Sequence, residues 1–261
     1  MRALIAALAA LLAWSVAADA EAQQRRSRRP RVNLAAYRRN VTRWHDPGRA
    51  SEPRYTDDGR LILRLVSLNG LGTAELTPAT ADGGFDEAAC AQAAHVMGDA
   101  RNHREAPMDR RLIEVVYAIA RHFRAGQVSV VSGFRAEANH SNHALGRAVD
   151  ILVPGVRDEA VAAFARTLGF TGVGVYPVSG FTHVDVRTRS FFWVDRSRPG
   201  STARRSRRSR RRRGGLTEVH GELARRSDAD ARARGVQPLG GTSGATVTEG
   251  ADGDEDADED G

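Results

Sequence analysis

The sequence predicts an α+β fold in which helices precede and interrupt a small sheet. Three observations favour this class. Short apolar segments rich in β-branched residues recur between residues 60 and 187. Longer segments with helical periodicity lie before and between them. The last two strand-like segments are separated only by a short turn that contains Ser179 and Gly180.

The first half of this region predicts one strand followed by two helices. The segment "RLILRLVSLNG" (60–70) is typical of a strand that ends at an Asn-Gly turn. A helix is expected over 86–98. A second helix is expected over 109–126, because Asp109 is a good N-cap and Gly126 a good stop. Its apolar stripe consists of Leu112, Val116, Ile119 or Ala120, and Phe123.

The second half predicts four more strands and one more helix. A buried strand over 127–133 leads into a polar loop, 134–146. The next strand is expected over 147–153 and ends at Pro154-Gly155. The segment 156–170 is expected to be a helix, with Gly169 as its stop signal. The closing strands are expected over 172–177 and 181–187.

The N-terminus has the pattern of a secretory signal peptide over residues 1–22. Arg2 precedes an apolar run from Ala3 to about Ala18, and small-residue cleavage patterns follow it. A membrane anchor is the alternative. The run is shorter than the roughly 20 apolar residues that span a bilayer, so export of a chain without a transmembrane helix is expected.

The remaining chain predicts one domain, 55–197, between two segments without a core pattern. Residues 23–54 are Arg-rich, and residues 198–261 are first basic and then acidic. Both are expected to be disordered because they have little apolar surface to bury. The formal net charge of +7 is therefore unevenly placed. The lone Cys90 excludes an internal disulfide and suits a small core residue.

Strand alternation gathers a histidine and two acids on sheet faces. In the strand 147–153, Asp150 shares a face with Ala148 and Leu152. In the strand 181–187, His183, Asp185 and Arg187 share a face. A buried carboxylate is costly unless it is paired or binds a metal. His143 and Asp150 belong to the pattern Ser-x-His-x-x-Gly-x-Ala-x-Asp. Two imidazoles and one carboxylate make a candidate zinc site with an open position for water.

The motifs "VSGFRAEANHSNHALGRAVDI" and "GVGVYPVSGFTHVDVRTRSFFW" resemble the zinc murein peptidases of the D-Ala-D-Ala metallopeptidase group. That group shares its fold with lysostaphin and the hedgehog signalling domain. The resemblance covers about 60–195 and points to an exported, bacterial, murein-endopeptidase-like branch. It implies a small antiparallel sheet with helices on one side and a Zn²⁺ site on the sheet face. It also implies that His143, Asp150 and His183 are the zinc ligands, and that Arg135 holds a substrate carboxylate or carbonyl.

One departure from this group leaves the general base open. Many relatives place the base two or three residues before the third ligand, where this chain has Gly180 and Phe181. Asp185 is the nearest acid and is expected to act either as the base or as a partner that fixes a ligand imidazole. Glu137 and His140 in the preceding loop are the next candidates, and Arg135 and His140 are alternatively ordinary loop residues.

These observations predict an exported zinc metallopeptidase of the periplasm or cell envelope that hydrolyses peptidoglycan cross-links or stem peptides, as an endopeptidase or a carboxypeptidase. The rival is a non-catalytic, zinc-containing domain that binds the cell wall or a partner. The Arg-rich tail suits contact with anionic envelope polymers. Nucleic acid is not expected as a partner, because the chain is exported and the run lacks the aromatic residues that stack on bases.

Overall fold

The computed structural model describes residues 33–136, 141–199 and 216–239. Its helices and strands follow one another in the order α2 (Leu34–Trp44), the 3₁₀ turn η1 (Pro47–Arg49), β1 (Leu63–Ser67), β2 (Thr73–Leu76), α3 (Glu87–Val96), α4 (Arg110–His122), β3 (Val128–Ser132), β4 (Ala148–Leu152), α5 (Asp158–Ala165), β5 (Thr171–Tyr176), β6 (Phe181–Val186), β7 (Phe191–Asp195), β8 (Leu216–Val219) and α6 (Gly221–Ala233). The α+β class is confirmed, and every strand and helix expected between 60 and 187 is present within a few residues of its predicted bounds.

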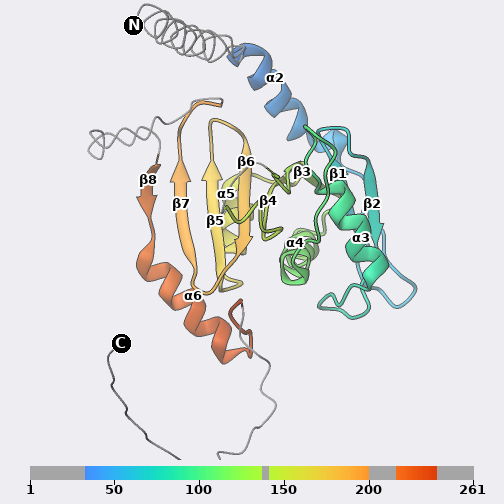
Figure 1. Cartoon of the computed structure of the whole chain (residues 1–261), viewed down its shortest axis with the longest axis vertical. Coiled ribbons are helices and arrows are strands. Elements are labelled where there is room, and N and C mark those ends of the chain that lie inside the picture. The colour runs from blue at the N-terminus through green and yellow to red at the C-terminus, as the bar shows by residue number, and fades with distance from the viewer. Residues whose placement is uncertain (1–32, 137–140, 200–215, 240–261) are drawn as a thin grey trace, which may run out of the picture.

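The sheet is larger than predicted and mixed (Figure 1). Its eight strands have the order β2-β1-β3-β4-β6-β5-β7-β8. β1 pairs with β3 in parallel, β5 pairs with β7 in parallel, and the other neighbours are antiparallel. The prediction of a small antiparallel sheet is therefore wrong. Parallel neighbours need a crossover, and β2, α3 and α4 supply it between β1 and β3.

One face of the sheet and the helices form a single hydrophobic core. Val149 and Ile151 of β4 belong to it, as do Val184 of β6 and Val173 of β5. Helices α3, α4 and α5 contribute their buried apolar side chains to the same cluster. Because side chains alternate along a strand, the residues between these valines and isoleucines point to the opposite face. That opposite face carries the polar residues of β4 and β6.

The N-cap, the apolar stripe and the C-terminal stop of helix α4 can each be compared with the sequence-based prediction. Asp109 is its N-cap and accepts a hydrogen bond from the backbone N–H of Arg111 at 3.0 Å. The buried stripe includes Leu112, Val116 and Ile119, as the periodicity predicted. The helix ends at His122, earlier than the expected Gly126, and Arg124 adopts a positive φ of 46° just beyond it. The stop is therefore a left-handed residue ahead of the glycine.

The two segments expected to be disordered contain folded elements. α2 lies within 23–54, and β8 and α6 lie within 198–261, so the prediction is wrong for those parts. In Figure 1, α2 and α6 lie at opposite ends of the molecule. The predicted signal peptide, the basic run 200–215 and the acidic end lie outside the described residues.

Helix α6 is held by a buried carboxylate. Asp228 accepts hydrogen bonds from the backbone N–H groups of Phe170 at 2.7 Å and Ser190 at 2.9 Å, and from the Ser190 hydroxyl at 2.6 Å. Phe170 has a φ of 51°, a left-handed conformation that a phenylalanine rarely adopts. The Asp228 contact helps to fix that turn, because it pairs the buried N–H of Phe170.

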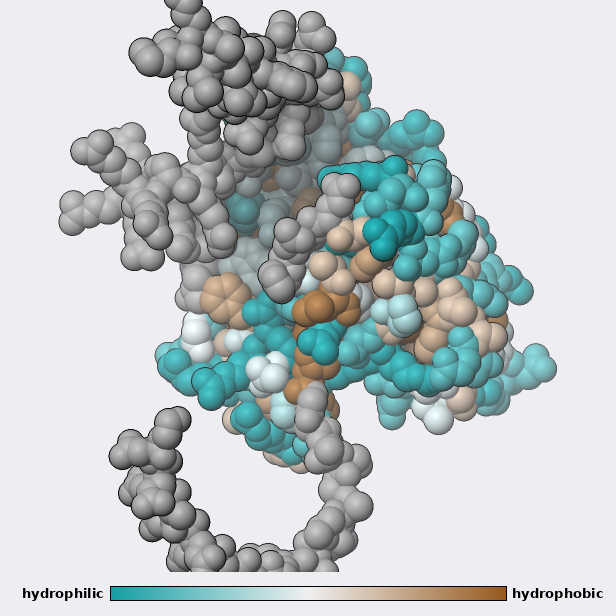
Figure 2. Space-filling model, viewed as in Figure 1, coloured by the Kyte–Doolittle hydropathy of each residue, from teal (hydrophilic) through white to brown (hydrophobic). Residues whose placement is uncertain are grey.

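The surface around this core is mainly hydrophilic on the face that Figure 2 shows, with smaller apolar areas among the polar residues. Among the described residues, the large apolar side chains that remain exposed are Tyr55, Leu145, Phe191 and Leu223. Within the described ranges, no helix is both long enough and apolar enough to cross a bilayer.

Candidate metal centre

The pairing of β4 with β6 places the two central site residues opposite each other. Asp150 of β4 is the register partner of His183 of β6. Both lie on the sheet face away from the core, in the orientation that alternation predicted. His143 reaches the same place from the turn before β4. All three side chains are buried: Asp150 is 3%, His143 6% and His183 8% exposed.

The three residues converge through one atom each. His143 Nε2 lies 3.2 Å from His183 Nδ1 and 3.5 Å from Asp150 Oδ1, and His183 Nδ1 lies 2.8 Å from Asp150 Oδ1. Ligands placed about 2.0–2.1 Å from a zinc ion at tetrahedral angles are about 3.3 Å apart. The observed separations bracket that value, so this donor set fits a zinc ion. It is the one such group of His, Cys, Asp and Glu within the described part of the chain.

His143 offers the correct nitrogen for a metal. Its Nδ1 lies 2.7 Å from the carbonyl oxygen of Gly133. A carbonyl only accepts, so Nδ1 carries the proton and donates it. The lone pair is therefore on Nε2, the atom that faces Asp150 and His183. A backbone carbonyl fixes both the tautomer and the direction of this ring.

Asp185 binds the ring nitrogen of His183 that points away from the common centre. The Nε2 of His183 donates to Asp185 Oδ2 at 2.9 Å, and its Nδ1 faces Asp150. Burial alone would lower the pKa of His183, but the hydrogen bonds to Asp150 and Asp185 outweigh burial and raise that pKa to about 9. Nδ1 is thus the atom on which a proton and a metal ion compete.

Asp185 is enclosed rather than open to the cleft. It is 1% exposed, and Arg187 donates to Oδ1 through Nε at 2.5 Å and to Oδ2 through Nη2 at 2.5 Å. Burial would raise the pKa of Asp185, but the hydrogen bonds from His183 and Arg187 outweigh burial and lower it to about 2. Both oxygens of this carboxylate are therefore already engaged. Arg187 lies on the strand face that alternation predicted for it, together with His183 and Asp185, but its role in binding Asp185 was not predicted.

Arg135 supports the remaining oxygen of Asp150. Its Nη2 donates to Asp150 Oδ2, and its Nε donates to the Ser132 hydroxyl at 2.8 Å. Ser132 faces the site because β3 shifts register between Val130 and Ser132, so that Val130 pairs with Ile151 and Ser132 with Asp150. Such a bulge turns a side chain to the other face of the sheet. In this structure Arg135 thus contacts a metal-site carboxylate.

Two aromatic side chains, Trp193 and Tyr176, lie beside the centre. The ring of Trp193 on β7 lies 5.2 Å from that of His183, and its Nε1 donates to the Tyr176 hydroxyl at 3.2 Å. β5 has glycines where it passes under these groups. A Cβ on Gly172 would lie 2.5 Å from Asp185 Oδ1, and a Cβ on Gly174 would lie 2.6 Å from Trp193 Nε1. The alternating glycines of "GVGV" were the available signal for this close packing.

Glu137 and His140, the other candidates for the general base, lie outside the described residues. Cys90 is a partly buried free thiol, and burial raises its pKa. Its packing against the hydrophobic core fits the predicted structural role.

Two comparisons with known proteins match this chain, and the family model covers the segment that contains these residues. A family model described as peptidoglycan L,D-endopeptidase MepK matches residues 59–190, about half of the chain. A Haemophilus influenzae protein named probable peptidoglycan L,D-endopeptidase MepK is 31% identical, over 39% of this chain and 63% of its own length. The chain therefore spans less than two thirds of that relative. No solved structure matches.

Proposed function

Because the chain belongs to the family of peptidoglycan L,D-endopeptidase MepK, we propose that it is an exported zinc metallopeptidase that hydrolyses peptide bonds in peptidoglycan cross-links or stem peptides. The observation that carries this proposal is the convergence of His143, Asp150 and His183 within the matched segment. Each imidazole presents one nitrogen to the common centre while its other nitrogen is held by a protein oxygen. This is the arrangement that a zinc ligand needs.

In this proposal His143 Nε2, Asp150 Oδ1 and His183 Nδ1 hold the zinc ion. When bound, zinc would act as a Lewis acid on the scissile carbonyl and lower the pKa of water near it. The chain's own residues hold the protons in place: the Gly133 carbonyl keeps one on His143 Nδ1, and Asp185 keeps one on His183 Nε2. Arg135 holds the second oxygen of Asp150, which leaves Oδ1 to face the two imidazoles.

Asp185 has a positioning role in this account. The contacts with His183 and Arg187, together with its burial, support that role over the role of general base, because neither oxygen faces open space. A general base must come within hydrogen-bond reach of the attacking water. We assign that task to a different group, and Glu137 and His140 are the first residues to test.

The proposal includes export and contact with the envelope. The signal-like segment 1–22 would direct the chain to the periplasm or cell envelope. Peptidoglycan peptides are the proposed substrate. The Arg-rich run would allow contact with anionic envelope polymers, with an affinity that falls as salt rises.

One observation favours a second candidate function, a non-catalytic zinc domain that binds the cell wall or a partner. Among the residues that the structure describes, the carboxylate bound to the back of His183, Asp185, is enclosed and not placed to take a proton from water. The two functions differ in one experiment: incubation of the purified chain with cell wall, with a chelator, and with zinc added back. Release of soluble muropeptides that the chelator abolishes and zinc restores supports the peptidase. Zinc-dependent binding without release supports the binding domain.

A further inference from the structure

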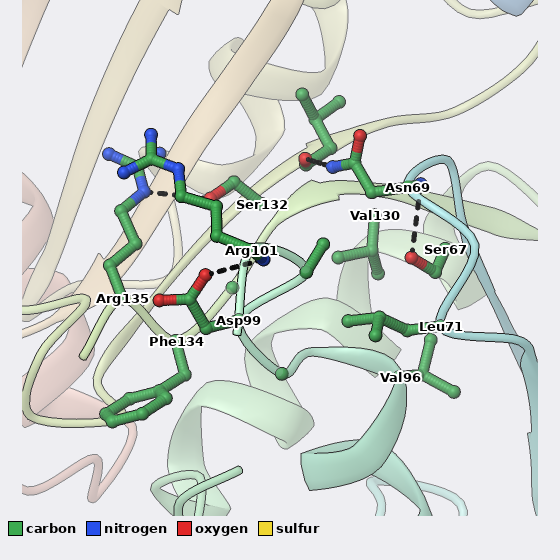
Figure 3. Close-up of a pocket in the computed structure, with 14 residues that line it drawn as sticks. Ser67, Asn69, Leu71, Val96, Asp99, Arg101, Val130, Ser132, Phe134 and Arg135 are labelled. Atoms are coloured by element: carbon green, nitrogen blue, oxygen red, sulfur yellow. Dashed lines mark hydrogen bonds between the residues drawn. The ribbon is translucent and has the colours of Figure 1, made fainter. Parts of the chain in front are cut away.

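A cavity of about 530 Å³ lies beside the metal centre and shares two supporting residues with it (Figure 3). Gly133, whose carbonyl holds His143, and Arg135, which holds Asp150, both line the cavity. The ends of β1 and β3, the C-terminal end of α3 and the loop after α3 form its walls. A ligand in this cavity would therefore lie directly against the groups that support the metal centre.

The two ends of the cavity differ in polarity. Leu71, Val96 and Val130 lie toward one end, and Val96 and Val130 are buried. The side chains of Arg101 and Arg135 extend together toward the other end (Figure 3). A ligand that fits both ends has a small apolar group at one side and an anionic group at the other.

Three ionisable residues line the cavity, and two of them are already paired. Arg135 is bound to Asp150 and Ser132. Asp99 accepts hydrogen bonds from the backbone N–H groups of Arg101 at 3.0 Å and Ala136 at 3.1 Å. Among the described residues, the guanidinium of Arg101 has no partner, and its side chain is exposed. Arg101 is therefore the ionisable lining residue, among those the structure describes, whose side-chain donors are free to bind a ligand.

Asp99 fixes the position of that charge. It is 6% exposed, and its two carboxylate oxygens tie the loop that carries Arg101 to the loop that carries Arg135. The second loop is also tied to the end of α3, because the Phe134 N–H donates to the Met97 carbonyl at 2.6 Å. The backbone that presents Arg101 is thus held relative to the metal centre. Such preorganisation lowers the entropic cost of binding.

We propose that Arg101 binds a free carboxylate of the peptide substrate in this cavity, next to the metal centre. The inference rests on the proposed function and adds a feature of the substrate: an anionic group close to the bond that is cut. A planar guanidinium suits this task because it donates two parallel hydrogen bonds to a carboxylate. Arg135 beside it is engaged with Asp150 and Ser132.

The test compares two substrates with three forms of the full chain loaded with zinc. One substrate is a cross-linked dimer of peptidoglycan stem peptides with free carboxylates, and the other is the same dimer with those groups converted to carboxamides. The proteins are the wild type, Arg101→Gln and Arg104→Gln. Arg104 is the matched control because it is exposed in the same loop but does not line the cavity. Hydrolysis gives kcat and KM, and calorimetry gives the affinity for each dimer in chelator-treated protein.

The wild type is expected to prefer the carboxylate form by about 10–100-fold in kcat/KM, which is the range for a hydrogen bond between charged groups. Arg101→Gln should lose that preference mainly through KM, and Arg104→Gln should keep it. Equal use of both dimers by the wild type, or an unchanged preference in Arg101→Gln, would overturn the inference. If the wild type hydrolyses neither dimer, the proposed peptidase function fails. The calorimetric preference, or its absence in the wild type, then still decides the role of Arg101.

Discussion

Asp185→Asn tests how the metal centre is supported, because it keeps the size of the side chain and removes its charge. Asp185 is 1% exposed and accepts hydrogen bonds from His183 Nε2 at 2.9 Å and from Arg187 Nε and Nη2 at 2.5 Å each. Asparagine has one acceptor oxygen, so its amide group must face a donor of either His183 or Arg187. If the amide faces His183, the ring is pushed toward the tautomer with a proton on Nδ1, which cannot bind a metal.

The size of the effect follows from these contacts. A hydrogen bond to a charged, buried group contributes about 1.5–3 kcal/mol, and about 1.4 kcal/mol corresponds to a tenfold change in affinity. We therefore expect the zinc Kd of Asp185→Asn to weaken by about 10–100-fold, as is typical when a contact behind a ligand is lost. Turnover at saturating zinc should stay close to that of the wild type, because the ligands themselves are intact.

The assay measures zinc affinity by competition with a chromophoric chelator, and turnover on soluble muropeptides at saturating zinc. Asp82→Asn is the control, because Asp82 is an exposed carboxylate paired with Arg121 far from the site. Wild-type zinc affinity with turnover reduced by about 10²–10⁴-fold would refute this reasoning, since that is the loss expected when a general base is removed. Wild-type values for both quantities would remove Asp185 from the account.

Three further predictions concern the parts around the ligands. Gly172→Ala should weaken zinc binding through Asp185 and Arg187. Gly221→Ala should not, because a Cβ there would meet only the end of the Arg225 side chain at 3.8 Å, an ordinary contact; equal zinc affinities of the two variants would contradict the packing argument. Asp228→Ala should lower the free energy of unfolding by about 2–4 kcal/mol, because it leaves the buried N–H groups of Phe170 and Ser190 unpaired. The control Asp230→Ala removes an exposed carboxylate of the same helix and should change that free energy little. Urea unfolding measures both variants, and equal stabilities would show that Asp228 does not anchor α6. In chelator-treated protein, the pKa of His183 is higher in the folded state, at about 9, than in the unfolded state, at about 6.5, so protonation of His183 stabilises the fold. This contribution to the free energy of unfolding is fully present below about pH 6.5 and is lost as the pH rises through about 9. The unfolding temperature should therefore fall across that range in the wild type and less in His183→Gln, and a flat wild-type profile would contradict the assignment.

Local patterns predicted the central part of the fold and the convergence of the site. Alternation along the strands placed Asp150 and His183 on the face that they share, because the period of two is a property of each strand alone. The partners behind the ligands depend on tertiary structure. The carbonyl of Gly133 reaches His143, and the guanidinium of Arg135 reaches Asp150, through loop geometry that the residue types do not encode.

The edge elements were missed for a different physical reason. Helix α6 buries only small or polar residues, Ala224, Ser227, Asp228 and Ala231, so it has no apolar stripe to detect. Its attachment depends on hydrogen bonds that Asp228 accepts from the backbone N–H groups of the distant Phe170 and Ser190. Helix α2 has no fully buried residue and is held by Tyr37, whose hydroxyl donates to the Ser179 carbonyl, and by the His45–Asp158 pair. Periodicity cannot reveal long-range contacts of this kind.

The central claim is that the His143, Asp150 and His183 centre hydrolyses peptidoglycan peptides. Mass spectrometry of muropeptides before and after incubation with the zinc-loaded chain tests it most directly, with His143→Ala as the matched control. The account predicts new peptide fragments from cross-linked or stem peptides with the wild type and none with His143→Ala. An unchanged muropeptide profile with folded, zinc-containing wild type, or equal fragment release by His143→Ala, would contradict it.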